Sequence, residues 1–477
     1  MELHGVDALF QTVVDGGFCI GCGVCAGSSP DKLTEMRMDA FGRIQPVRVE
    51  PSPVHEPTID VLRLCPFSNE APDEDDISQA LFEGACQKHP LIGYYSDCLA
   101  AHVVEGDFRA RGSSGGLATW LLTELLISGT VDAILHVRPR TPDSRDPRLF
   151  AYAVSSSVEE VRAGARSHYY PVEVSQVLQH VLAHDMRYAF VGIPCFVKAV
   201  RLAMEQNAML KHRIKHCVGI FCGHLKSAAY ADSLAWQCGI PPGRLTAISF
   251  RRKIPERKAS DYGMAFEGIV DGRSTVKEAR SAELYGGDWG LGFFKYQACD
   301  YCDDVTAETA DVAIGDAWLP GYVDDSQGTS IVVVRNTDLG EMLNRGVAEG
   351  RVSAQRIGPD VVALSQRGGF RHRRQGLSYR LYLAEKRGGY CPRKRVPPNS
   401  FRHDRRFQNI QGLRPIISQL SHYCWADASS SGVFERFVEC MGPVVQLYND
   451  AYATKPSLLW RLPGGVWRRL VQMFRSA

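Results

Sequence analysis

The chain has 477 residues, 45% of them hydrophobic, and its 55 Lys and Arg nearly balance 53 Asp and Glu. This length and composition suit a globular protein with two or three well-packed domains. No uncharged apolar run reaches the roughly eighteen residues that cross a bilayer, and the segment before Thr12 lacks the basic start and apolar core of a secretory signal. The sequence therefore predicts a cytoplasmic protein, not a membrane-spanning or secreted one, and we expect no nucleic-acid partner.

Fifteen cysteines are many for a chain of this length. In a reducing compartment such cysteines are expected to be metal ligands or buried thiols, not disulfides. Seven of them show no ligand spacing, and we expect each to be a core thiol or an incidental surface thiol: Cys86, Cys98, Cys217, Cys238, Cys391, Cys424 and Cys440.

Three cysteines near the N-terminus, Cys19, Cys22 and Cys25, have the C-x2-C-x2-C spacing with which bacterial-type ferredoxins bind an iron-sulfur cube. The two glycines between them let the backbone curl tightly. The next cysteine, Cys65, precedes a proline, as the fourth ligand of such a cube often does. The sequence predicts one 4Fe-4S site from these four residues. A zinc knuckle is the alternative, although zinc sites usually pair two C-x2-C units.

From about residue 90 to residue 337, apolar runs alternate with helical patterns, which predicts an α/β core. We expect strands at 101–104, 131–137, 187–191, 217–221, 310–318 and 331–334, and helices at 117–128, 174–183 and 196–204. A Gly/Ser loop at 112–116 opens the first of these helices. Its backbone N-H groups and the positive end of the helix dipole suit a pyrophosphate, although such loops are also common helix caps.

A second group of cysteines is distributed along the expected α/β core. Cys195 follows the strand at 187–191, Cys222 follows the strand at 217–221, and Cys299 and Cys302 share one turn further on. Ligands of α/β proteins bind at the carboxyl ends of parallel strands. These four soft ligands could hold a second cube, and a structural zinc site would need the same residues.

The C-terminal part of the chain is basic. Between Phe370 and Phe407 there are twelve Lys and Arg but two acidic residues. At the very end, Gly465 to Phe474 has the pattern of a short basic amphipathic helix. These segments could hold an acidic ferredoxin or give peripheral contact with an anionic membrane, although most such helices dock on their own protein.

The chain resembles the coenzyme F420 hydrogenase/dehydrogenase beta-subunit family, which also includes the ferredoxin-dependent 7-hydroxymethyl chlorophyll a reductases and one class of divinyl chlorophyllide reductases. The matching stretches follow the family's order over roughly residues 19 to 335: 19–25, 65–66, 113–119, 192–195, 221–223, 299–304 and 310–318. The resemblance fades after about residue 370.

The resemblance implies a flavoprotein in which FAD lies on the α/β core close to iron-sulfur clusters. It assigns the flavin site to Ser114, Gly115, Gly116, Thr119, Ser167 and Tyr169. The family usually has a lysine between the last two, and His168 stands there in this chain, which puts any role of that charge in doubt. It also implies that the second cluster of two-cluster members is held by Cys195, Cys222, Cys299 and Cys302.

The fold expected overall is an α/β core, a mixed sheet with flanking helices, preceded by a small ferredoxin-like iron-sulfur unit and followed by a mostly helical C-terminal extension. The expected units are residues 1–85 for the iron-sulfur unit, 86–369 for the FAD- and cluster-binding domain, and 370–477 for the extension.

The favoured function is an oxidoreductase that takes electrons from ferredoxin or another redox partner protein and passes them through two 4Fe-4S clusters and FAD to a small organic substrate. Clusters carry one electron each and flavin carries two, so this pairing fits a one-electron donor. The alternatives are a coenzyme F420 oxidoreductase subunit and a non-catalytic electron-transfer subunit of a polysaccharide-related pathway. Candidate proton donors are His168, His224 and Asp316, although residues of this kind are more often structural than catalytic.

Overall fold

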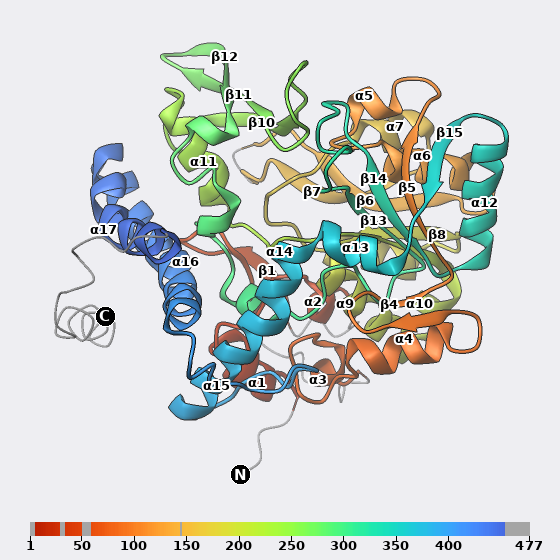
Figure 1. Ribbon diagram of the computed structural model, residues 1–477, viewed down its shortest axis with the longest axis horizontal. Coiled ribbons are helices and arrows are strands. Elements are labelled where there is room, and N and C mark those ends of the chain that lie inside the picture. The colour runs from red at the N-terminus through yellow and green to blue at the C-terminus, as the bar shows by residue number, and fades with distance from the viewer. Residues whose placement is uncertain (1–4, 29–33, 50–58, 144–145, 454–477) are drawn as a thin grey trace.

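The computed structural model describes residues 5–28, 34–49, 59–143 and 146–453 (Figure 1). The terminal helix expected at Gly465 to Phe474 lies outside these residues. Among the helices described, none is both long and apolar enough to cross a membrane.

The centre of the molecule is an eight-stranded mixed sheet (Figure 1). Its strands lie in the order β15 (Val352–Arg356), β5 (Asp97–Val103), β14 (Ser330–Val334), β13 (Val312–Asp316), β9 (Ile214–Ile220), β8 (Tyr188–Gly192), β6 (Ala133–Pro139) and β7 (Phe150–Ser155). The four strands from β13 to β6 are parallel, whereas β14, β5, β15 and β7 add antiparallel pairs. The prediction of a mixed α/β core is confirmed.

Alternation along the strands divides the core between the two faces of the sheet. On β6, Ile134 packs with one apolar cluster and Leu135 with another. The Ile134 face is covered by α6 (Leu117–Ile127), α7 (Val158–Ala163) and α12 (Thr337–Ala348). The Leu135 face is covered by α8 (Ser175–Ala183), α9 (Pro194–Gln206), α10 (Ala208–Arg213) and α13 (Pro359–Ser365). Both faces are buried, which explains the apolar run of β14.

The N-terminal region packs on the Leu135 face of the sheet through one shared apolar cluster. Its elements are α1 (Gly5–Leu9), a π turn at Phe10–Val14, α2 (Val24–Gly27), the hairpin β1 (Thr34–Met38) and β2 (Ile44–Arg48), α3 (Val61–Leu64), α4 (Glu74–Phe82) and the short pair β3 (Gln87–His89) and β4 (Gly93–Tyr95). These short elements do not confirm the expectation of a ferredoxin-like unit, which stays a prediction.

A third apolar cluster, apart from the two on the faces of the large sheet, joins a separate three-stranded sheet to the C-terminal helices (Figure 1). The sheet consists of β10 (Leu245–Arg252), β11 (Gly263–Val270) and β12 (Arg273–Arg280), and it packs with α11 (Ala228–Gln237), α16 (Arg405–Ser431) and α17 (Phe434–Tyr452). A disulfide between Cys424 and Cys440 links α16 to α17. The expectation that these two cysteines are unpaired thiols is therefore wrong, because folding the helix pair brings together residues 16 apart in the sequence.

The basic segment after Phe370 does not form a single exposed surface. It contains α14 (Arg367–Arg371), a π turn at His372–Gly376 and α15 (Leu377–Arg387), followed by an irregular stretch up to α16. Five of its twelve basic side chains point into the protein: Arg373, Arg374, Arg380, Lys394 and Arg395. Arg395, for example, contacts Glu308 at 2.8 Å and Asp303 at 3.3 Å. Part of the basic excess therefore neutralises buried carboxylates of the core.

Candidate functional site

The N-terminal cysteines come together as the sequence predicts. Cys19, Cys22 and Cys25 lie on the turn that enters α2, and Cys65 follows α3, with all four thiols close enough to interact electrostatically. Burial raises the pKa of each, and neighbouring thiols add to the shift of Cys19, Cys22 and Cys65, the pKa of Cys65 being raised to about 12. Backbone N-H groups point at the sulfurs, as where Gly21 N-H donates to Cys19 Sγ at 3.3 Å. Such thiols are expected to ionise only when a metal binds.

The glycines between these cysteines allow close contact with neighbouring segments. Gly21 has φ +67, and a Cβ there would lie 2.2 Å from the carbonyl oxygen of Ile44. Gly23 has φ +80, and its Cβ would lie 2.5 Å from Glu173 Oε2. The loop can therefore lie against β2 and the segment before α8 only because both residues lack side chains.

The second group of cysteines gathers at the carboxyl edge of the parallel strands. Cys195 lies in the first turn of α9 after β8, Cys222 follows β9, and Cys299 and Cys302 lie on and just after the 3-10 turn Gln297–Tyr301. Each interacts electrostatically with the others. Burial, with the neighbouring thiols adding to it, raises the pKa of Cys222 to about 12 and that of Cys299 to about 11. The backbone N-H of Leu225 donates to Cys299 Sγ at 3.2 Å.

The two cysteine sets adjoin each other. Cys195 of the second set interacts electrostatically with Cys22 of the first. The Tyr152 ring lies beside both thiols, stacks on Phe190 with ring centroids 5.5 Å apart, and donates its hydroxyl to Val191 O at 2.8 Å. No group of three His, Cys, Asp or Glu among the described residues has the spacing of a single-ion site. A cube spreads its thiolates more widely than one ion does, so this leaves both cluster predictions untested.

A cavity of about 1080 Å³ opens beside the second set. Its lining includes five of the six residues predicted for the flavin, Ser114, Gly116, Thr119, Ser167 and Tyr169, and also Cys222. The sixth, Gly115, points elsewhere, since a Cβ there would lie 2.5 Å from Ala101 O of β5.

The two predicted flavin elements meet in the structure. The backbone N-H of Ser167 donates to Ser113 Oγ at 2.8 Å, which joins the 165–169 segment to the Gly/Ser loop. The same loop is tied to β14 on its other side, since Ser114 Oγ donates to Thr329 O at 2.8 Å and Gly115 N-H donates to Ser330 Oγ at 3.1 Å. The role of these residues in flavin binding stays a prediction.

The cavity is strongly cationic. Asp316 is its single acidic lining residue, and both of its carboxylate oxygens are held by Arg251, at 2.7 and 3.1 Å. Eight basic residues line it: Arg166, Lys226, Arg251, Lys295, Arg367, Arg371, Arg373 and Arg414. Such a lining suits an anionic ligand.

Comparison with known proteins gives the family. Residues 98–179 match the N-terminal model of the coenzyme F420 hydrogenase/dehydrogenase beta subunit, and residues 185–360 match its C-terminal model. The chain belongs to this beta-subunit family. The second cysteine set and the cavity loop lie inside the matched ranges, whereas the first set and everything after residue 360 lie outside them.

Individual relatives of this beta-subunit family are distant. The coenzyme F420 hydrogenase subunit beta of Methanococcus voltae is 22% identical over 271 residues, which cover 56% of this chain and 86% of that protein. Among solved structures, the F420-reducing NiFe hydrogenase complex of Methanosarcina barkeri has a chain with 17% identity and a TM-score of 0.47, covering 64% of this chain and 99% of that one.

The three candidate proton donors of this family member differ in state. Burial lowers the pKa of His168 to about 4, and its ring lies against Phe150 with centroids 4.4 Å apart. Burial and nearby cations lower the pKa of His224 well below its usual value, and its ring stacks on Trp289 at 4.2 Å. Both imidazoles are therefore neutral at pH 7, and Asp316 is ion-paired with Arg251. Neither histidine is therefore a charged proton donor at neutral pH.

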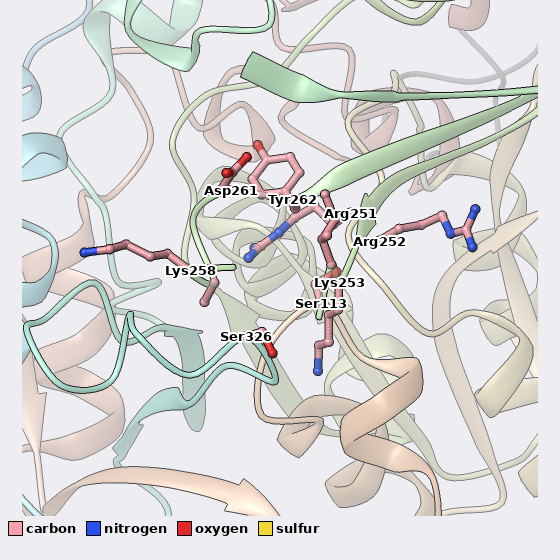
Figure 2. Close-up of a pocket in the computed structure, with 10 residues that line it drawn as sticks. Ser113, Arg251, Arg252, Lys253, Lys258, Asp261, Tyr262 and Ser326 are labelled. Atoms are coloured by element: carbon pink, nitrogen blue, oxygen red, sulfur yellow. The ribbon is translucent and has the colours of Figure 1, made fainter. Parts of the chain in front are cut away.

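A smaller pocket beside the Gly/Ser loop shows how the loop is held (Figure 2). Lys253 Nζ donates to three backbone carbonyls, those of Arg109, of Ser114 at 2.9 Å and of Gln327 at 2.5 Å. Burial and the guanidinium of Arg109 lower the pKa of Lys253 to about 8. Lys253 therefore holds the Gly/Ser loop in place through these hydrogen bonds. The sequence does not reveal this role, because the three partner residues are spread over more than two hundred positions.

Proposed function

We propose that this chain is an iron-sulfur flavoprotein oxidoreductase. It receives electrons from ferredoxin or a similar one-electron carrier protein at the Cys19, Cys22, Cys25 and Cys65 set. The electrons pass to the second cysteine set and reach a small organic substrate in the cavity. The observation that carries this proposal is that three sites lie side by side. The first four-thiol set adjoins the second, and the second adjoins a large cavity lined by basic residues.

The donor sets suit the metal clusters proposed for them. Four thiols per set is the ligand number of a 4Fe-4S cube, and the buried sulfurs accept backbone N-H bonds that stabilise thiolates. Arg373 places a buried positive charge beside the second set. Its Nε and Nη1 atoms lack hydrogen-bond partners among the described residues. Bound clusters would supply one-electron transfer.

The cavity suits FAD in size and charge. About 1080 Å³ is at the upper end of ligand pockets. The start of α6 lies at the cavity wall, where its unpaired N-H groups and positive dipole favour a diphosphate. When bound, FAD would collect two electrons and deliver them to the substrate. Ser114, Gly116 and Thr119 would hold its diphosphate, and Tyr169 would line its ring.

A second candidate is hydride exchange with coenzyme F420 as a subunit of a larger complex. The observation that favours it is that the matched relative from Methanococcus voltae is, by name, a coenzyme F420 hydrogenase subunit. The cationic cavity also suits an anionic deazaflavin. A hydride donor could reduce FAD directly, so this function does not need the first cysteine set.

The decisive experiment compares donors. Anaerobically purified protein should contain about eight iron per chain, and its flavin should be bleached rapidly by reduced ferredoxin in stopped-flow mixing. Cys22→Ser should lose the first cluster, keep FAD, and lose bleaching by ferredoxin. Cys238→Ser is the matched control, because that half-buried thiol lies in neither set. Rapid bleaching by reduced F420 that survives Cys22→Ser, with none by ferredoxin, would favour the second candidate. Zinc in place of iron would contradict the two cluster assignments and with them the first candidate.

A further inference from the structure

Arg373 is a buried basic residue that lies beside the second cysteine set. It lies in the π turn between α14 and α15 and is 2% exposed. Its guanidinium interacts electrostatically with Cys302, Cys222 and Cys299, and Arg373 and Cys222 line the same cavity. Two of its nitrogens, Nε and Nη1, are buried without a hydrogen-bond partner among the described residues.

Two nearby carboxylates, those of Asp300 and Glu308, are already engaged by other cations. Asp300 Oδ1 accepts from Lys295 Nζ at 2.5 Å and lies 3.8 Å from Arg380 Nε. Glu308 is paired with Arg374 and Arg395. Within the part of the chain that the structure describes, Arg373 has no ion pair with an acidic side chain. Because burying an unpaired guanidinium is costly, the natural counter-charge is the group that the four thiols hold.

Among the residues that the structure describes, the first cysteine set has no such cation. The two basic groups that interact with it are each paired with a carboxylate: Arg43 with Asp39 at 2.7 Å, and Lys198 with Glu74 at 3.2 Å. The two sets therefore have similar ligands in different electrostatic surroundings. Among the described residues, the second set alone has a buried cation without an ion pair that interacts electrostatically with its sulfurs.

We propose that Arg373 is a positioning residue that compensates the charge of the second cysteine set and gives the cluster there a higher reduction potential than the first. This inference rests on the proposed function. A one-electron reduction by the carrier protein adds one negative charge to the cluster, and an adjacent buried cation favours that added charge. Electrons then move downhill from the first set to the second. Arg373 lies beyond both matched family ranges, so the C-terminal segment becomes part of the redox site.

The test is an EPR-monitored potentiometric titration of the full-length holoprotein. Arg373→Gln and Arg373→Met both remove the positive charge. Methionine fills much of the arginine's volume and leaves no buried polar group that could hinder folding. We expect the equilibrium constant for reduction of the second cluster to fall at least about tenfold, which is about 59 mV for one electron. The first cluster should be unchanged. Arg373→Lys keeps the charge and should restore most of the potential.

Arg374→Gln is the matched control. It removes the same charge one residue away, where the guanidinium pairs with Glu308 at 3.2 Å. If Arg373 and Arg374 variants shift the second cluster equally, or Arg373 variants leave it unmoved, the inference is wrong while the proposed function stands. If Arg373→Gln and Arg373→Met lose iron from the second set and Arg373→Lys keeps it, that result supports the inference. Wild-type protein without a second cluster overturns both.

Discussion

Lys253 gives the most direct residue-scale test of the flavin loop. Its ammonium bonds the carbonyls of Arg109, Ser114 and Gln327 and so fixes the loop that lines the cavity. Lys253→Met should loosen the loop and weaken FAD binding about tenfold, the loss expected for one or two hydrogen bonds. Lys258→Met is the control, because Lys258 lies in the same small pocket with its side chain 65% exposed (Figure 2). Flavin retained on dilution measures the difference, and equal retention would contradict this role of Lys253.

The same lysine predicts a pH effect. With its pKa lowered to about 8, Lys253 loses its proton as the pH rises through 8. The neutral amine has one donor fewer and no charge, so FAD affinity should fall between pH 7 and 9. Lys253→Met should abolish this fall. A wild-type affinity that stays flat over that range would show that the amine remains protonated in its cradle.

Asp232 on α11 predicts a pH-dependent stability. Burial raises its pKa to about 7, above the usual value near 4 for an aspartate. The folded state therefore favours the protonated form, and the protein loses stability as the pH rises from 4 to 7. Asp232→Asn should raise the free energy of unfolding by roughly 1–2 kcal/mol at pH 8 and hardly change it at pH 4. Urea unfolding at both values tests this, with Asp185→Asn, 86% exposed at its side chain, as the control.

At the scale of elements, the first turn of α6 offers a cleaner probe of flavin binding than its glycines. Gly116 has φ +82, and a Cβ there would lie 2.6 Å from Phe108 O, so any substitution strains the backbone with or without a ligand. Thr119 instead lines the cavity from the helix. Thr119→Glu should expel FAD by repelling the diphosphate, while a glutamate near a helix N-terminus does not harm the helix. Thr119→Gln has the same size without charge and should keep FAD. Equal flavin content in both would show that no phosphate lies there.

The elements that the sequence predicts well are those with strong local patterns. The helix expected at 117–128 is α6, and the strands expected at 187–191 and 217–221 are β8 and β9, because unbroken apolar runs in a sheet buried on both faces leave little ambiguity. The meander of β10, β11 and β12 was missed, since its outer strand is polar and mostly exposed. No local signal marks the Cys424–Cys440 disulfide, which depends on the antiparallel packing of two helices.

At the scale of the molecule, the candidate site combines what sequence spacing shows with what only folding can show. Ligand spacing and strand ends predict eight cysteines in two sets, and the structure gathers each set. The proximity of Cys195 to Cys22 could not be predicted, because it joins segments more than 170 residues apart through the packing of the N-terminal region on the sheet. The burial of Arg373 beside the second set could not be predicted either, because the many charges of its segment indicated an exposed surface.

That basic segment leads to a prediction about the whole chain. Arg395 has a side chain 7% exposed, contacts Glu308 and Asp303, and lies near Glu74, so it joins the C-terminal segment to the core. Arg395→Met should leave buried carboxylates unpaired and lower the free energy of unfolding by about 3–5 kcal/mol. Arg387→Met, on the exposed end of α15, removes the same charge and should cost less than about 0.5 kcal/mol. Urea unfolding of both variants compares them. If the two are equally stable, and both react more slowly with ferredoxin at low salt only, the segment serves as a docking surface instead of a structural brace.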